Sequence, residues 1–282
     1  MPKIAAVVLL FNPREEVLSH VESYKEAIDH LYIVDNTEDA SSSEHIRKKL
    51  LSFSHTSLLH ISENIGIAKA FNLALNEAKK DGYTWLMTMD QDSFFDQENL
   101  DYYLQHFTVR NKQNVALVSP LHNPKFVNHS VEDPYTICES VLSSGNLVNV
   151  DAALDAGGYD ERLFIDEVDH AFCFELQRHG YMIMQDQTVY LNHMLGTTFS
   201  TRGNIKLYPP LRIYYMLRNY LYLKEEYSSE FPVFFKERNW YLFKFFMKQL
   251  FFSKERVQHF KMMKRGYKNY KNRIYGKYDA RY

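Results

Sequence analysis

The sequence predicts an α/β fold in which helices cover a sheet and a C-terminal helical extension follows. Short apolar runs rich in β-branched residues recur along the first part of the chain, without alternation with polar residues. Helical patterns separate these runs, which is typical of parallel strands buried on both faces. Near residue 230 the composition changes, and basic and aromatic residues become frequent. We therefore predict two segments with different tasks, residues 1–225 and residues 226–282.

The first segment supplies the strands and helices of the predicted sheet. Its opening run, residues 3–11, has no small-residue cleavage site and runs into Asn12 and Pro13, so we expect a buried strand rather than a signal peptide. No run of about 18 apolar residues occurs, and we expect no membrane-spanning helix. Further strands are expected at residues 30–35, 56–61, 83–90 and 114–120, with helices at residues 14–29, 43–52, 66–80 and 97–110.

Carboxylates follow two of these strands. Asp35 and Asp90 fall where a strand gives way to a loop, and ligands of open α/β sheets bind at the carboxyl ends of the strands. Asp92 lies two positions after Asp90, and the two side chains can converge if the chain turns there. Their hard oxygens suit Mg²⁺ or Mn²⁺ shared with substrate phosphate. A solvated strand end in which Asp92 caps the next helix would give the same residues.

The remaining motifs narrow the function classes. No G-x-G-x-x-G follows the first strand and no G-x-x-x-x-G-K-[ST] occurs, so dinucleotide-binding and P-loop folds lose their main support. The D-x-D loop lacks the Gly and Glu of an EF-hand. A haloacid-dehalogenase-type phosphohydrolase with Asp90 as nucleophile stays open as an alternative. Cys138 and Cys173 form no metal motif, and a reduced, cytoplasmic setting is the simplest interpretation.

An ordered set of motifs resembles the family 2 glycosyltransferases of the GT-A fold. The motifs are "VVLLFN", "IVDN", "NIGIAKAFNLAL", "MTMDQDSFF", "SSGNLVN", "GGYDERLFIDEVDHAFCFELQRHGY" and "LNHMLGTTF". They cover roughly residues 3–225 at family-like spacing, and the chain is most similar to bacterial rhamnosyltransferases that build surface polysaccharides. The resemblance implies a Rossmann-like mixed sheet flanked by helices, and a metal-dependent, inverting transfer of a sugar from a nucleotide-diphosphate sugar.

The resemblance also assigns a donor site. Asp35 would accept hydrogen bonds from the base or the ribose of the donor nucleotide. Asn64 and Gly66 would shape the turn that opens a helix beside the donor, where glycine permits backbone angles closed to other residues. The chemistry of a helix N-terminus alone would also explain these two residues.

A metal site follows from the same resemblance. Asp90 and Asp92 would hold Mn²⁺ or Mg²⁺ against the leaving diphosphate, with Asp92 the more direct ligand. His193 lies 24 positions after Asp169, where related galactofuranosyl members of the family place a metal-binding His. Neutral imidazole suits Mn²⁺ beside two carboxylates, so His193 is the predicted third protein ligand. A lone His is otherwise more often a packed or exposed residue.

The segment "LFIDEVDHAFCFELQRHGY" matches the approximate family pattern F-I-D-x-V-D-x-E-W-C-L-R. The match places the catalytic base on Asp169 and a supporting carboxylate on Asp166. Such a base typically contributes about 10²–10⁴-fold to the rate. Ala171, Phe172 and Glu175 depart from the pattern, which leaves open a non-catalytic relative that binds sugar nucleotides. An acidic first turn that complements the helix dipole would also explain the carboxylates.

Two arginines lie further on, in "YPPLRIYYMLRNYLYL", which resembles the R-x-Y-Y-x-x-R-N segment of the family. Arg212 and Arg218 would neutralise phosphate in the donor or the acceptor, because guanidinium matches phosphate geometry. Positions on a helix surface would fit them equally well.

The C-terminal segment is strongly basic. From Phe231 onward about 14 Lys and Arg stand against about 3 Asp and Glu, although the whole chain has a net charge of −2. Lys236, Lys244 and Lys248 share a helical face with Trp240 between them. Amphipathic helices on an anionic membrane fit this composition and a lipid-linked acceptor, and we expect no nucleic-acid partner. Helices packed on the catalytic domain or on a second subunit of a homo-oligomer would fit as well.

Together these features predict a metal-dependent, inverting glycosyltransferase. We expect it to move rhamnose from dTDP-rhamnose to a growing surface polysaccharide or a lipid-linked oligosaccharide. The expected location is the cytoplasm, at the inner face of the cell membrane.

Overall fold

The computed structural model describes residues 3–109, 114–122, 134–193, 200–202 and 205–281. The strands are β1 (Ile4–Leu10), β2 (His30–Asp35), β3 (Thr56–His60), β4 (Trp85–Asp90), β5 (Ser93–Phe94), β6 (Val115–His122), β7 (Tyr135–Ile137), β8 (Asn146–Asn149), β9 (Met182–His193), β10 (Ser200–Arg202) and β11 (Ile205–Leu207). The helices are α1 (Glu16–Lys25), α2 (Glu44–Leu51), α3 (Ile67–Lys80), α4 (Gln97–Val109), α5 (Val150–Asp155), α6 (Val168–Arg178), α7 (Pro210–Tyr227), α8 (Pro232–Phe252) and α9 (Arg256–Lys271).

A large mixed sheet carries the strand order β3-β2-β1-β4-β8-β6-β9-β5, and β7 also pairs with β9. The strands from β3 to β4 are parallel, while β8 runs antiparallel to both β4 and β6. The five strands and four helices predicted for residues 3–120 are confirmed as β1 to β4, β6 and α1 to α4. The carboxyl ends of β1, β2, β4 and β6 therefore lie at the same edge of the sheet.

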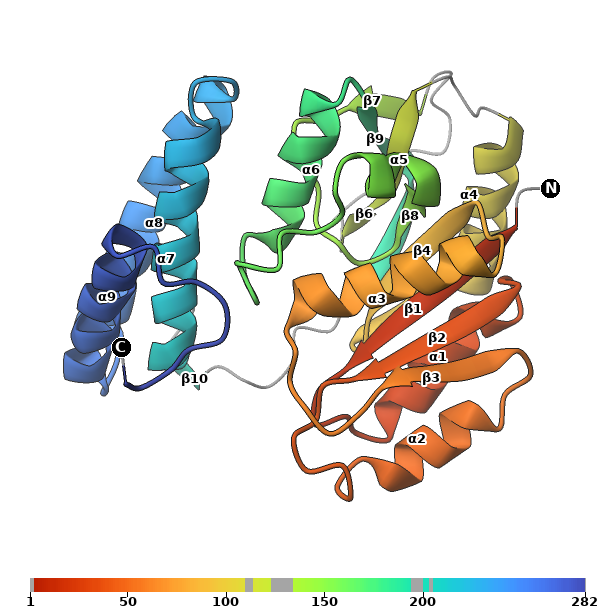
Figure 1. Ribbon diagram of the computed structural model, residues 1–282, viewed down its shortest axis with the longest axis horizontal. Coiled ribbons are helices and arrows are strands. Elements are labelled where there is room, and N and C mark those ends of the chain that lie inside the picture. The colour runs from red at the N-terminus through yellow and green to blue at the C-terminus, as the bar shows by residue number, and fades with distance from the viewer. Residues whose placement is uncertain (1–2, 110–113, 123–133, 194–199, 203–204, 282) are drawn as a thin grey trace.

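Strand β1 shows why the sequence forms a sheet that is covered on both sides. All seven of its residues are buried. Because side chains alternate along a strand, one set packs with α3 and the other with α1 and α4. Figure 1 shows α3 lying across one face of β1 and β4, with α1 behind the sheet. An unbroken apolar run is what such a strand needs, because neither face meets water.

The short strand β5 positions part of the site. The chain leaves β4 at Asp90, turns, and pairs antiparallel with the far end of β9, so that Ser93 lies opposite His193. This pairing brings together residues that are 100 positions apart in the sequence.

Helices α7 to α9 stand side by side next to α6 (Figure 1). Helix α9 packs closely on α7 at Gly266, where an added Cβ would lie 2.8 Å from the carbonyl oxygen of Tyr214. Helix α7 runs across the boundary that the sequence predicts at residues 225 and 226, and the division into two segments stays a prediction. Within the described residues, no helix is long and apolar enough to cross a membrane.

Candidate active site

A cleft with two adjoining lobes opens at the carboxyl edge of the sheet. The first lobe has a volume of about 380 Å³ and lies between the ends of β1, β4 and α3. The second, of about 320 Å³, lies between α6, α7 and the end of β6. The residues that line both lobes are Ile67, Asp90, Ile165, His193 and Arg212. Two of the predicted metal ligands therefore stand at the junction of the lobes.

The predicted metal ligands meet there. Single ligand atoms of Asp90, Asp92 and His193 all lie within 4.8 Å of one another. Nδ1 of His193 is 3.4 Å from Oδ1 of Asp92 and 2.7 Å from the hydroxyl of Ser93. Oδ1 of Asp92 is buried and accepts no hydrogen bond from the described residues. Two carboxylates and an imidazole at this spacing could hold a divalent cation such as Mn²⁺.

The electrostatics of Asp90 and Asp92 also favour a bound cation. Burial raises the pKa of Asp90 to about 6, and the nearby charge of Asp92 adds to the shift, whereas His193 acts in the opposite direction. Two carboxylates this close disfavour each other's ionised form. A bound cation would offset both the burial and the repulsion.

The first lobe contains the predicted turn before α3. Gly66 has a φ of +82°, and an added Cβ would lie 2.6 Å from the carbonyl oxygen of Phe164. The backbone N–H of Ile67 donates to that same oxygen over 2.7 Å, and Asn64 accepts a hydrogen bond from the N–H of Gly66. Only glycine fits this close approach, which joins the start of α3 to the loop that precedes α6.

Asp35 lies outside the cleft. Its side chain is fully buried and accepts hydrogen bonds from Ser43 at 2.6 Å, from Arg47 at 2.7 Å and from the N–H of Thr37 at 3.0 Å. The neighbouring Asn36 lines the first lobe instead. This carboxylate holds the loop after β2, and the contact between Asp35 and the donor nucleotide stays a prediction.

The second lobe contains both carboxylates of the predicted acceptor site. Asp169 lies in the first turn of α6, and Asp166 lies in the preceding loop. Arg212 from α7 donates to both oxygens of Asp166 over 2.8 to 3.0 Å. Burial raises the pKa of Asp166 above its usual range, although the Arg212 guanidinium acts in the opposite direction. Arg212 lines both lobes, so it reaches the cleft as predicted while already paired with Asp166.

The loop before α6 has an unusual backbone. Phe164, Asp166 and Glu167 have φ values of 65°, 64° and 63°, which residues with side chains rarely adopt. Such strain persists only where the surroundings hold it in place. The side-chain amide of Asn219 donates to three carbonyl oxygens of this loop, those of Leu163, Ile165 and Asp166.

Arg218 belongs to the same support. It is fully buried, and its guanidinium donates to the carbonyl oxygens of Leu163 at 3.1 Å and Gly276 at 2.8 Å. These hydrogen bonds of its guanidinium connect α7 to the loop before α6 and to the C-terminal residues. The contact of Arg218 with phosphate stays a prediction.

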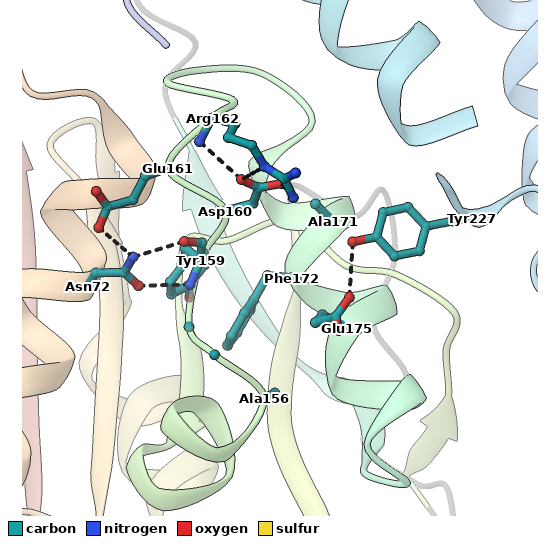
Figure 2. A pocket seen from close by; sticks show the side chains of 12 residues that line it. Asn72, Ala156, Tyr159, Asp160, Glu161, Arg162, Ala171, Phe172, Glu175 and Tyr227 are labelled. Atoms are coloured by element: carbon teal, nitrogen blue, oxygen red, sulfur yellow. Dashed lines mark hydrogen bonds and ion pairs between the residues drawn. The ribbon is translucent and has the colours of Figure 1, made fainter. Parts of the chain in front are cut away.

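The departures from the family pattern lie on the other side of α6. Successive residues of a helix are rotated by about 100°, so Ala171 and Glu175 point away from Asp169. Figure 2 shows Ala171, Phe172 and Glu175 beside a separate hollow of about 390 Å³, where Glu175 accepts a hydrogen bond from the hydroxyl of Tyr227. None of these three residues lines either lobe of the cleft, as far as the described residues show.

The sequence analysis did not single out several residues of the second lobe, among them His122, Glu167 and Arg238. Burial lowers the pKa of His122 to about 4, and one ring nitrogen lies 2.8 Å from the carbonyl oxygen of Ser144. His122 ends β6 at the same edge as Asp90, so the rule applied to the aspartates could have found it. Arg238 comes from α8, and nothing in the sequence indicated that this helix reaches the cleft.

Comparison with known proteins identifies the family. Residues 6–142 match the family model described as Glycosyl transferase family 2. The chain is 26% identical over 234 residues to the dTDP-rhamnosyl transferase RfbF of Shigella flexneri, and the match covers 77% of this chain and 78% of that protein. Residues 6–142 therefore form a family 2 glycosyltransferase domain, and the chain is a glycosyltransferase. The predicted enzyme class is thus confirmed, and the phosphohydrolase alternative is set aside.

Solved structures confirm the GT-A fold. GalNAc-T7 with UDP, GalNAc and Mn²⁺ matches with a TM-score of 0.65 at 10% identity, over 97% of this chain and 56% of that one. S. aureus TarS 1-349 in complex with UDP-GlcNAc matches with a TM-score of 0.62 at 14% identity, over 96% of this chain and 82% of that one. The chain therefore spans little more than half of GalNAc-T7 and most of the TarS fragment.

Replacing Asp90 with Asn should stabilise the metal-free glycosyltransferase by a few degrees near neutral pH. The raised pKa means that the ionised carboxylate costs folding stability above about 6, and this cost disappears as the pH falls towards the ordinary value of 3.8. The gain over the wild type should therefore shrink in acid. Thermal unfolding across this pH range, with and without Mn²⁺, measures both effects.

Asp101→Asn, an exposed change on α4, serves as the control. Asp90→Asn should also lose the stabilisation that Mn²⁺ gives to the wild type. A less stable metal-free variant, or one that Mn²⁺ stabilises as strongly as the wild type, would contradict this electrostatic account.

Proposed function

We propose that this glycosyltransferase moves a sugar from a nucleotide-diphosphate sugar to a saccharide acceptor with inversion at the anomeric carbon. The observation that supports this most is the cluster of Asp90, Asp92 and His193 at the junction of the two lobes, with Asp169 in the second lobe. A donor diphosphate in the first lobe and an acceptor in the second would then meet beside the cluster. The two similar structures contain UDP and UDP-GlcNAc, which fits a nucleotide-sugar donor.

The metal site would serve the leaving group. Mn²⁺ or Mg²⁺ held by Asp90, Asp92 and His193 would neutralise the charge that develops on the diphosphate. Arg212 lines both lobes and adds a fixed positive charge beside the same junction. Asn64, Gly66 and Asn36 would shape the nucleotide end of the first lobe.

Asp169 would act as the base. Its carboxylate would take the proton of the acceptor hydroxyl while that oxygen forms a bond to the anomeric carbon and the bond to the diphosphate oxygen breaks. Attack from the face opposite the leaving group gives inversion. Asp166 is engaged with Arg212 through both oxygens, so its role would be to hold the loop and orient the acceptor.

For the sugar we propose rhamnose from dTDP-rhamnose, because the curated relative is a dTDP-rhamnosyl transferase. The acceptor would be a surface polysaccharide or a lipid-linked oligosaccharide under assembly in the cytoplasm. Tighter binding of a UDP-sugar or GDP-sugar than of dTDP-rhamnose would overturn the choice of donor.

Replacing Asp169 with Asn should lower sugar transfer about 10²–10⁴-fold, because the amide keeps the shape but cannot accept the proton. The affinity for the donor nucleotide should stay within a few-fold, since the base contacts the acceptor. Release of dTDP in the presence of acceptor and titration of the donor measure the two quantities. Asp101→Asn is the matched control, and turnover near the wild-type rate in Asp169→Asn would refute the assignment.

Helix α8 supports peripheral contact with a membrane. Its buried residues Phe235, Leu242, Phe246 and Gln249 form one stripe. The large exposed side chains on the rest of its surface are Val233, Trp240, Tyr241, Phe243, Phe251 and Phe252. Lys236, Lys244 and Lys248 are exposed beside them, and Nζ of Lys244 lies 4.5 Å from the ring centroid of Trp240. Aromatics with adjacent lysines suit the interface of an anionic bilayer, which would place the enzyme at the inner face of the cell membrane.

The triple change Lys236→Glu, Lys244→Glu and Lys248→Glu should abolish sedimentation with phosphatidylglycerol vesicles at low salt. Each basic residue near such a surface contributes about 1 kcal/mol and is screened by salt, so high salt should also release the wild type. The matched control is the same change at Lys48, Lys79 and Lys80, which are exposed on α2 and α3. If the α8 variant binds as well as the wild type, the exposed face serves packing or a homo-oligomer instead.

A further inference from the structure

We infer that Glu167 and Arg238 form a paired hydrogen-bonding site that recognises neighbouring hydroxyl groups of the acceptor saccharide. This inference rests on the proposed transfer to a saccharide and adds residues that select the acceptor. It also means that the C-terminal extension completes the active site rather than only anchoring the enzyme.

The two residues meet in the wall of the second lobe. Nη2 of Arg238 donates to Oε1 of Glu167 over 2.5 Å. The side chain of Glu167 is 1% exposed, while that of Arg238 is 24% exposed. Glu167 is separated from Asp169 by a single residue, so the pair stands next to the proposed base.

The pair leaves hydrogen-bonding capacity unused. Oε2 of Glu167 and Nε of Arg238 are both buried, and neither has a hydrogen-bond partner among the described residues. A buried polar atom without a partner is costly, and such atoms in native structures call for an explanation. Here one unfilled acceptor and one unfilled donor belong to two side chains that are already joined.

A saccharide matches this combination. Each hydroxyl group both donates and accepts, so one sugar hydroxyl can donate to Glu167 while its neighbour accepts from Arg238. A phosphate would meet the repulsion of the Glu167 carboxylate, and an apolar group would leave both atoms unfilled. The chemistry therefore favours a neutral, hydroxylated ligand in the second lobe, as the acceptor sugar is.

Contacts of α8 with α6 and α7 fix the position of Arg238. Phe235 packs against Phe174 of α6, with 5.7 Å between the ring centroids. Asn239 accepts a hydrogen bond of 2.6 Å from the hydroxyl of Tyr220 of α7. An arginine that is fixed in this way loses little conformational entropy when a ligand binds, which favours recognition of that ligand.

The test compares Arg238→Lys with the wild type. Lysine keeps the positive charge beside Glu167 but loses the planar fork of donors. The matched control is Arg273→Gln, which breaks an exposed ion pair between the C-terminal segment and Glu225 of α7. Transfer is measured with octyl glycosides of glucose, galactose, rhamnose and N-acetylglucosamine as acceptors, and with dTDP-rhamnose, UDP-galactose and UDP-N-acetylglucosamine as donors. The best pair is carried forward with the monodeoxy analogues of its acceptor.

We expect Arg238→Lys to raise the KM for the acceptor about tenfold, with a thermal midpoint near that of the wild type and an unchanged affinity for dTDP. Removal of the hydroxyl group that contacts Arg238 should raise the acceptor KM of the wild type, but much less that of the variant. The deoxy analogue and the substitution remove the same interaction, so their effects should not add. Glu167→Gln should raise the same KM.

A purely structural role predicts a different result. If Arg238→Lys has the thermal midpoint and the acceptor KM of the wild type, and removal of each hydroxyl group costs the same in both proteins, the inference is wrong and the proposed function stands. If the wild type transfers sugar to none of the acceptors, the proposed function fails and the inference fails with it.

Discussion

The chemistry proposed for the cleft depends on two carboxylates, Asp90 and Asp92, that the fold places close together. Asp90 ends the buried strand β4, and Asp92 follows in the turn to β5, so the pleat that would point them apart is broken between them. Burial and mutual repulsion raise the pKa of Asp90 to about 6. The pairing of β5 with β9 adds His193 to the same point. In the proposed function, a cation shared with the donor phosphate would relieve this repulsion.

A second constraint holds the opposite wall of the cleft. The loop from Leu163 to Glu167 contains three residues with positive φ. It is held by Arg212, Arg218 and Asn219 of α7 and by Arg238 of α8. The carbonyl oxygen of Phe164 also accepts the N–H that opens α3. The loop therefore connects the first lobe with the second, and contacts from α7 and α8 stabilise it.

The features that could be predicted from the sequence are those that local patterns determine, namely the strands of the sheet and the residues at their ends. The apolar runs of β1 to β4 and β6 identified the sheet, and strand ends pointed to Asp90, Asp92 and the edge where the cleft lies. Resemblance to a family located His193, Asp166 and Asp169, although their roles stay proposals. The sequence could not show which of these side chains have partners inside the protein: Asp35 and Arg218 are buried and hydrogen-bonded to internal groups. Arg238 could not be predicted because the packing of α8 against α6 depends on the whole fold. Ala171 and Glu175 depart from the family pattern, but both line the separate hollow on the other side of α6.

The central claim is that Asp90, Asp92 and His193 hold the metal that receives the donor diphosphate. Anomalous diffraction from crystals grown with Mn²⁺ and dTDP tests it most directly, because manganese scatters anomalously and the protein's own atoms contribute little. The account predicts a peak within ligand distance of all three side chains, with the diphosphate of dTDP on its open side. A manganese peak elsewhere in the cleft, or bound dTDP with no metal between these residues, would contradict it.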